Sequence, residues 1–287
     1  MKTISVAHSP DADDIFMYYA IKFGWVRAKD AKFDNIAADI ETLNQATLKG
    51  EYDICAISFA LYPFVKDDYA LLKTAVSFGE GYGPKLIKKI GTKLKRNFKV
   101  ALSGEFTTNA LLFKIAYPEA RISYMNFLEI EEAVLNGTVD AGVLIHESIL
   151  NYNKKLEVEK EMWDIWVELS GGGLPLPLGG MCLRRSIPLH SAIDYENTLI
   201  KAVEVANKNR HVLAPMLIEK GLIRVNAATL DKYLDLYAND NSVKMSDIQY
   251  EALDKLYELG YKNRFYENLI KSKEFLIPSE YEELRAR

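Results

Sequence analysis

A histidine and a glutamate stand side by side directly after a short apolar run, in the stretch DAGVLIHESIL at 140–150. Residues 141–145 have the apolar, partly β-branched composition of a buried strand. His146 would then lie at the carboxyl end of that strand, where open α/β sheets hold their ligands. A neutral imidazole there could serve as a general base, with Glu147 as a neighbouring ligand contact. A histidine buried for structural reasons would produce the same local pattern.

Two neighbouring features would act on the charge of His146 in opposite directions. A helix beginning at Glu147 or Ser148 would place its positive end beside the imidazole, which would favour the neutral ring, as would the apolar strand. The Glu147 carboxylate would favour the protonated ring. The sequence therefore leaves both protonation states open.

Two other segments bring polar side chains to the ends of expected strands. In HSPDADD, Ser9 has the position of a helix cap, and Asp14 follows in the first turn. In AISFALY, Ser58 follows a buried strand, so its hydroxyl and the nearby amides could bind an anion. Plain helix capping would explain both segments equally well.

A third segment, SGEFTTNAL at 103–111, opens an apolar helix with Thr107, Thr108 and Asn109. Free backbone amides and the positive end of the helix converge at such a position, which suits a carboxylate. One threonine would be enough for capping, so the second threonine and the asparagine favour a binding site.

Other kinds of chemistry find no matching pattern in the sequence. The remaining histidines, His8, His190 and His211, are scattered, and Cys55 and Cys182 stand alone in apolar runs, so no zinc-ligand spacing emerges. There is no GxxxxGK[ST] phosphate loop, no GxGxxG dinucleotide turn and no GxSxG nucleophile elbow. We therefore expect neither a metal nor an organic cofactor.

The composition is that of a globular protein that works away from nucleic acids and membranes. The 287 residues are 49% hydrophobic and 26% charged, with a formal net charge of -4 at pH 7, so no basic surface is expected. No run approaches eighteen apolar residues, and the opening MKTISVAHSP enters a strand without a signal-peptide pattern. These features predict a cytoplasmic protein, and they leave its oligomeric state open.

Strand and helix patterns alternate along the first half of the chain, which is typical of βαβ units and a largely parallel sheet. The first series of expected elements is strand 4–7, helix 13–23, strand 36–40, helix 42–49 and strand 53–57. The second is strand 98–102, helix 107–117, strand 121–125, helix 128–135 and strand 141–145. After Pro188 the pattern is helical, at 195–208, 214–220, 227–237 and 246–259.

Two glycine-rich stretches separate these series, GEGYGPKLIKK at 79–89 and SGGGLPLPLGGMCLRR at 170–185. They predict a first α/β lobe formed by 1–83 plus 186–287 and an inserted second α/β lobe at 84–185, joined by two crossing strands. Two such lobes enclose a ligand cleft and close over it by a hinge motion. The carboxyl ends of the strands in both lobes should face that cleft.

Six segments, taken in order, resemble the 1,4-dihydroxy-6-naphthoate synthase family of the futalosine route to menaquinone. They are HSPDADDIFMYYA, DIETLNQATLKGEYDICAISFALY, GYGP, GEFTTNALL, GVLIHES and GLPLPLGG, spread over residues 4–185. The likeness implies an α/β fold like that of type II periplasmic binding proteins. It also implies a cytoplasmic lyase that, without a metal or organic cofactor, converts cyclic dehypoxanthine futalosine to 1,4-dihydroxy-6-naphthoate and dihydroxyacetone.

The resemblance also assigns roles to individual residues. The histidine of the family's IHES motif, its proposed base, falls on His146. The matched ligand contacts are Ala56, Ile57, Ser58, Thr107 and Thr108, with Asn109 adjacent. The expected contacts with a small aromatic carboxylate are completed by Asn44 of ETLN and Gly83 of GYGP, and by the ring-holding residues Tyr62, Leu176 and Pro177.

The first motif departs from the family pattern, which is closer to SPCPND-[TS]-F. The chain reads SPDADDIF, so Asp14 and the Ser-Pro cap are kept. Asp11, Ala12 and Asp13 stand where the pattern has Cys, Pro and Asn. These replacements add acidic groups near the cleft and leave the ligand role of the loop open.

The resemblance supports a specific reaction hypothesis. His146 would remove a proton from the substrate, and the electron flow that follows would break a carbon–carbon bond in retro-aldol fashion, driven by aromatisation of the new ring. Three alternatives share the architecture: a solute-binding protein, a small-acid sensor without catalysis, and the sister enzyme chorismate dehydratase. The lack of an export signal disfavours the first, and the ETLN, TTN and IHES segments favour the synthase over the last.

Overall fold

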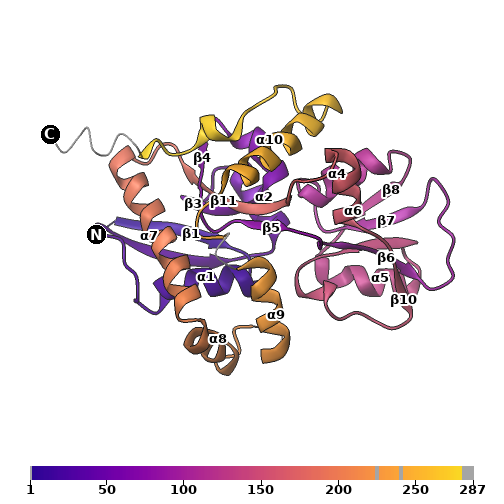
Figure 1. Cartoon of the computed structure of the whole chain (residues 1–287), viewed down its shortest axis with the longest axis horizontal. Helices are drawn as coiled ribbons and strands as arrows, with labels where there is room; N and C mark the ends of the chain where they lie inside the picture. Colours follow the sequence, from indigo (N-terminus) through magenta and orange to yellow (C-terminus); the bar gives the residue numbers. More distant parts are fainter. Residues whose placement is uncertain (1, 224–225, 239–241, 280–287) are drawn as a thin grey trace.

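Two sheets covered by helices make up two lobes, which lie side by side along the long axis of the molecule (Figure 1). The computed structural model describes residues 2–223, 226–238 and 242–279. The lobes are connected by the chain between β5 and β6 and by the chain that returns into β11 (Figure 1). The predicted α/β fold with two lobes and two crossings is therefore confirmed.

The first lobe contains the sheet with strand order β2-β1-β3-β11-β4, in which β5 also pairs with β11. Its strands are β1 Lys2–His8, β2 Ala31–Ala37, β3 Ile54–Ser58, β4 Tyr69–Leu71, β5 Ser77–Gly79 and β11 Leu176–Arg184. β1 runs parallel to β2 and β3, whereas β11 runs antiparallel to β3, β4 and β5.

Helices from both ends of the described chain cover the first sheet. They are α1 Ala12–Lys22, α2 Ile40–Leu48, η1 Phe59–Leu61, α3 Tyr62–Val65, α7 Leu189–Lys208, α8 Arg210–Glu219, α9 Ala227–Tyr237, α10 Asp247–Lys262 and η5 Ser272–Phe275. α1 packs with α7, α8 and α9, while α2 contacts β3 and α10 contacts β11. The helical pattern expected after Pro188 therefore supplies the cover of the first lobe.

The second lobe contains the sheet with strand order β10-β6-β9-β7-β8. Its elements are β6 Lys85–Lys89, β7 Lys99–Leu102, α4 Thr108–Ala116, β8 Arg121–Tyr124, η2 Phe127–Glu129, α5 Ile130–Asn136, β9 Ala141–Leu144, η3 His146–Ile149, β10 Leu156–Glu161 and α6 Met162–Ser170. β7 is parallel to β8 and β9, and β6 is antiparallel to β9 and β10.

Two expected boundaries differ from the structure. The second lobe was expected to extend to 185, but β11 hydrogen-bonds to β3, β4 and β5 and so belongs to the first sheet. The return crossing therefore precedes β11, near Gly171, Gly172 and Gly173, whose positive φ angles turn the chain after α6. The strand expected at 36–40 is instead β2, at 31–37, and α2 already begins at Ile40.

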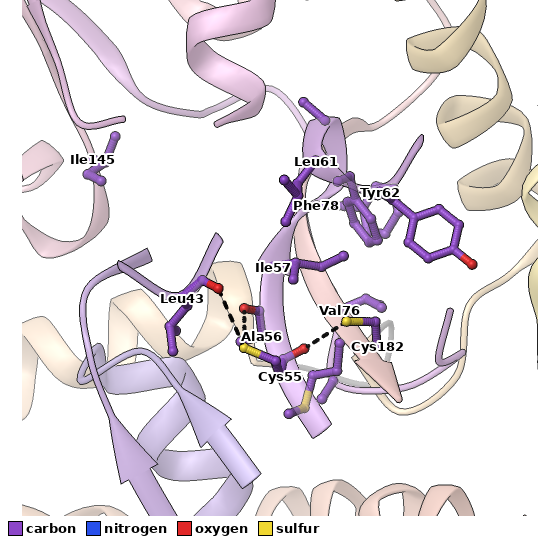
Figure 2. Close-up of a cluster of buried hydrophobic side chains, with 14 of the residues drawn as sticks. Leu43, Cys55, Ala56, Ile57, Leu61, Tyr62, Val76, Phe78, Ile145 and Cys182 are labelled. Atoms are coloured by element: carbon purple, nitrogen blue, oxygen red, sulfur yellow. Dashed lines mark hydrogen bonds between the residues drawn. The ribbon is translucent and has the colours of Figure 1, made fainter. Parts of the chain in front are cut away.

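The core of the first lobe contains both cysteines. Cys55 and Cys182 are directly opposite each other on β3 and β11, and both are free thiols with no exposed surface. The Cys182 Sγ lies 3.6 Å from the Cys55 carbonyl oxygen, within the apolar cluster of Figure 2. Burial raises the pKa of Cys55 to about 12, so the thiols act as small core residues, as predicted.

The packing of α5 against β9 fixes the strand that leads to His146. Gly142 lies in this strand, and a Cβ atom there would approach the Ile130 Cγ2 atom to 2.4 Å and the Val134 Cγ2 atom to 3.1 Å. Both helix side chains are almost fully buried. Because the contact is so close, only glycine fits beneath α5 at this position.

The substitution Gly142→Ala should lower the free energy of unfolding by about 1–3 kcal/mol, because the added methyl group overpacks the interface between α5 and β9. Urea denaturation of the purified protein measures this. A double variant that also carries Ile130→Ala provides the control, since removing the opposing methyl groups makes room for the alanine. The Ile130→Ala single variant is measured as well. If the stability losses of the two single variants simply add up in the double variant, this packing is contradicted.

Within the described part of the chain, no helix combines the length and the hydropathy needed to cross a membrane.

Candidate active site between the lobes

A cavity lies between the two lobes, with about 740 Å³ of space between the atoms when its open mouth is included. The first lobe lines it with Ser9, Asp11, Asp14, Ile40, Ala56, Ile57, Ser58, Ala75, Ser77, Leu178, Gly179, Gly180 and Tyr233. The second lobe lines it with Pro84, Ser103, Thr107, Thr108, Asn109, Ile145 and His146. Ile57 and Ile145, which Figure 2 labels, come from the ends of β3 and β9.

The structure brings most of the sequence-predicted site residues to this one cavity. Those that line it are Ser9, Asp14, Ala56, Ile57, Ser58, Thr107, Thr108, Asn109 and His146. Each of them lies in the last residues of a strand, in the segment just after it or in the first turn of a helix, so the predicted meeting of strand ends at the cleft is what brings them together. The side chain of Glu147 falls outside the described part of the structure.

His146 lies two residues after the end of β9 and contacts the opposite lobe. Its Nδ1 atom lies 2.9 Å from the Asp11 Oδ2 atom, and its side chain is 20% exposed. The ring of Phe127 meets the imidazole edge-on, with 5.1 Å between ring centroids. The backbone of His146 has a φ of 55°, a left-handed conformation that costs a residue with a side chain roughly 1–2 kcal/mol.

The helix expected to begin at Glu147 or Ser148 is absent from the described chain, where a single 3₁₀ turn spans His146–Ile149 instead. A turn this short carries little dipole. The predicted effect of a helix end on the imidazole was therefore wrong, and Asp11 is a carboxyl group in contact with the ring.

The loop between β1 and α1 holds two carboxyl groups at the cavity. Asp11 precedes the first residue of α1 and is buried, and it accepts a hydrogen bond from the Ser9 hydroxyl on the oxygen that also faces His146. The Ser9 backbone N–H donates to the Asp14 Oδ2 atom at 2.8 Å. The His8 Nδ1 atom lies 2.6 Å from the Ser9 carbonyl oxygen, and this contact supports the same loop.

Burial raises the pKa of the Asp14 carboxyl to about 7, and the nearby charge of Asp11 contributes in the same direction. The hydrogen bond from the Ser9 N–H and the proximity of His146 oppose this rise. Asp14 therefore exchanges a proton near neutral pH, in a cavity that also holds an imidazole. Such a combination is typical of acid–base sites.

The start of α4 uses its two threonines in different ways. The Thr107 hydroxyl caps the helix by accepting from the Ala110 N–H at 3.1 Å. The Thr108 hydroxyl accepts from the Ala60 N–H at 3.3 Å and donates to the Leu178 carbonyl at 3.1 Å, and both partners belong to the first lobe. One threonine is therefore a cap and the other a bridge between the lobes.

Two polar atoms near this helix start are buried without a hydrogen-bond partner in the described residues. They are the Ser103 hydroxyl and the Asn109 Oδ1 atom, and both residues line the cavity. A buried polar group without a partner is costly, so an unpaired group in a cavity wall is well suited to bind a ligand. Ser103 was not among the predicted site residues, although the segment 103–111 was.

Asn44 was predicted to contact substrate, but the structure gives it a supporting position instead. It is fully buried; its Oδ1 atom accepts from the Ser58 N–H at 3.0 Å, and its Nδ2 group donates to the Ser58 hydroxyl at 3.2 Å. This paired contact fixes Ser58 at the cavity wall. Glu41, one turn earlier on α2, approaches the Phe106 N–H of the other lobe at 3.4 Å.

The predicted ring-holding residues lie away from the cavity. Tyr62 has no exposed surface, donates its hydroxyl to the Tyr69 carbonyl at 2.9 Å, and lies in the buried cluster of Figure 2. Leu176 is fully buried and packs over Gly83, where a Cβ atom would come within 3.0 Å of the Leu176 Cδ2 atom. Pro177 pairs with Phe78 of β5.

The wall expected from residues 176 and 177 is instead formed by residues 178–180. The pairing of β11 with β5 shifts register between Pro177 and Gly179, and this irregularity turns the following residues toward the cavity. Gly180 faces Phe59, since a Cβ atom there would lie 2.7 Å from the ring. Leu178 and two glycines of β11 therefore line this part of the wall in place of the predicted residues 176 and 177.

Two lobes joined by two crossings, with a cavity between them, define the periplasmic-binding-protein fold. The aliphatic sulphonate-binding protein of Escherichia coli superposes with a TM-score of 0.65 at 12% identity, covering 98% of this chain and 99% of its own. A likeness at this identity shows the fold alone. A protein of Archaeoglobus fulgidus is more similar, with a TM-score of 0.84 and 31% identity over 92% of this chain and 98% of its own.

The chain belongs to the menaquinone biosynthesis family, whose sequence model matches residues 4–262. A relative from Streptomyces coelicolor is 31% identical over 258 residues, which are 88% of this chain and 90% of the relative. One from Thermus thermophilus is 27% identical over 267 residues, 90% of this chain and 93% of the relative. Both are named 1,4-dihydroxy-6-naphthoate synthase. The predicted family and fold class are therefore confirmed.

The substitution Asp14→Asn should stabilise the protein increasingly as the pH rises from about 4 to about 7. The folded wild type keeps a proton on Asp14 up to a pKa of about 7, whereas the unfolded chain releases it near 3.8, so the wild type loses stability across this window. The amide can still accept from the Ser9 N–H and does not titrate.

Urea denaturation of both proteins at several pH values measures the effect. We expect the stability of Asp14→Asn relative to the wild type to rise by roughly 4 kcal/mol between pH 4 and pH 8. A difference in the free energy of unfolding that stays constant over this range would contradict the elevated pKa.

Proposed function

We propose that the protein is a cytoplasmic carbon–carbon lyase of menaquinone biosynthesis that converts cyclic dehypoxanthine futalosine to 1,4-dihydroxy-6-naphthoate and dihydroxyacetone. The observation that carries the proposal is the position of His146, at a strand end in the interlobe cavity and within hydrogen-bond distance of a buried carboxyl group. Family membership and the names of the two relatives support the reaction class.

His146 acts as the general base in the proposed reaction. A neutral imidazole accepts a proton from the substrate, and the electron pair left behind breaks the carbon–carbon bond to the three-carbon fragment. The new ring system becomes aromatic, which provides the driving force. Deprotonation followed by bond cleavage requires no redox step, so the proposal includes neither a metal nor an organic cofactor.

The start of α4 is the proposed seat of the substrate carboxylate. Ser103 lines the cavity with an unpaired hydroxyl group, and α4 begins with its positive end a few residues further along the chain. The Ser103 hydroxyl is a donor, as an anion requires. The ring system then lies against Ile57, Ile145 and residues 178–180, where apolar surface limits the entry of water.

The alternatives predict ligand binding without chemical change, or a different product. A solute-binding protein or a sensor would bind the ligand and return it unaltered, and a chorismate dehydratase would act on chorismate. Incubation of the purified protein with cyclic dehypoxanthine futalosine, followed by chromatographic detection of the naphthoate and of dihydroxyacetone, tests the proposal directly. Absence of both products would overturn it.

The substitution His146→Asn should reduce naphthoate formation by roughly 10²–10⁴-fold, the range that a positioned general base contributes. Asparagine is chosen because it tolerates the left-handed backbone at this position better than alanine. Far-UV circular dichroism should remain that of the wild type. The exposed His190 provides the matched control, since His190→Asn should leave turnover unchanged; near-normal turnover in His146→Asn would reject the role.

The substitution Ser103→Ala should raise the KM for the substrate about tenfold while changing kcat little, because it removes one hydrogen bond to a bound carboxylate. The same change should leave the free energy of unfolding unchanged or slightly higher, since the buried hydroxyl has no partner in the described residues. Ser186→Ala, at an exposed position, is the control. A KM equal to that of the wild type would place the carboxylate elsewhere.

A further inference from the structure

We propose that Asp11 is a positioning residue for His146, and that the two side chains meet only when the lobes close. The catalytic role of Asp11 rests on the proposed function. The contact between Asp11 and His146 can be tested without measuring enzyme activity. Asp11 precedes α1 in the first lobe, whereas His146 follows β9 in the second. Their 2.9 Å contact therefore crosses the cleft.

The Asp11 carboxyl group is held in a fixed direction. The Ser9 hydroxyl donates to its Oδ2 atom, and the Asp11 carbonyl oxygen accepts from the Ile15 N–H at 3.0 Å as α1 begins. The residue is only 2% exposed, so solvent screens the contact little. A carboxyl group fixed in this way can orient an imidazole that reaches it from the other lobe.

The burial of Asp11 argues that the contact has a purpose beyond stability. Its second oxygen, Oδ1, is buried without a hydrogen-bond partner in the described residues. A buried carboxyl group that is only partly paired costs free energy, so a fold selected for stability alone would gain by replacing it. Such unpaired groups are usually retained where a site uses them.

The neighbouring Asp14 assists this arrangement. Two carboxyl groups close together do not both ionise easily, and burial raises the pKa of Asp14 to about 7. Asp14 therefore takes up a proton near neutral pH, next to the carboxyl group that faces His146.

The chemical consequence concerns the imidazole tautomer. A neutral His146 that donates its Nδ1–H to Asp11 carries its lone pair on Nε2, and that nitrogen is then the base. The strained backbone of His146 and the edge-on ring of Phe127 restrict the other ring orientations. When the lobes open, Asp11 moves away and the tautomer is no longer fixed. The base is therefore set for proton transfer only in the closed form.

The experiment compares the wild type with Asp11→Asn, in which the side chain keeps its shape and loses its charge. The first measurement is the ¹⁵N spectrum of the histidine rings in the full-length protein at pH 7.5, with His146→Asn used to assign the His146 signals. The wild type should show the His146 proton on Nδ1. The variant should show displaced signals and an increased share of the Nε2–H tautomer.

The second measurement is steady-state turnover of cyclic dehypoxanthine futalosine. Asp11→Asn should lower kcat on the order of 10²-fold while KM stays within about threefold, because positioning acts on the chemical step. Asp67→Asn is the matched control, since the Asp67 side chain is 83% exposed and its contact is with Lys66 at the surface. Both measurements should remain unchanged in this control.

The outcomes separate the two proposals. His146 ring signals that are the same in the wild type and Asp11→Asn overturn the positioning role, whatever the turnover. If the His146 signals of Asp11→Asn are displaced but its kcat equals that of the wild type, the contact with Asp11 has no catalytic importance. A wild type without turnover rejects the proposed function, yet displaced signals would still support the contact. If Asp11→Asn does not fold, the smaller Asp11→Ser takes its place in both measurements.

Discussion

The hydrogen bonds of the Thr108 hydroxyl connect the two lobes at the start of α4. One hydroxyl accepts from the Ala60 N–H and donates to the Leu178 carbonyl, so a group of the second lobe satisfies two backbone groups of the first. Opening the lobes would expose all three to water, which can replace each bond at little net cost. These bonds therefore fix how the lobes meet while contributing little net free energy, as suits a site that must admit and release its ligand.

The candidate site follows from this closed geometry. Strand ends of both sheets meet at the cavity, so short polar segments far apart in the sequence become neighbours. Asp11 and His146 are the clearest case, since they are 135 positions apart and 2.9 Å from atom to atom. Family membership then gives the arrangement a chemical context, because the matched region covers both residues.

The sequence predicted the strand ends well because buried strands are continuous apolar runs, and the polar residue that follows each run is easily located. It could not tell which apolar neighbours face the core. Tyr62 ends the predicted segment AISFALY, yet its hydroxyl reaches the Tyr69 carbonyl in the core. Leu176 and Pro177 were misplaced because the register shift in β11 has no sequence signal. Asp11 was missed because an acid at a helix start also fits ordinary capping.

The two core cysteines make the hinge motion accessible to fluorescence. Both native thiols are enclosed between β3 and β11, and burial raises the pKa of each, so a thiol-reactive dye finds no ready target on the folded protein. Cysteines introduced on the outer surfaces of the two lobes would then react first. A donor and an acceptor dye attached there would report the separation of the lobes in real time, with the native core left intact.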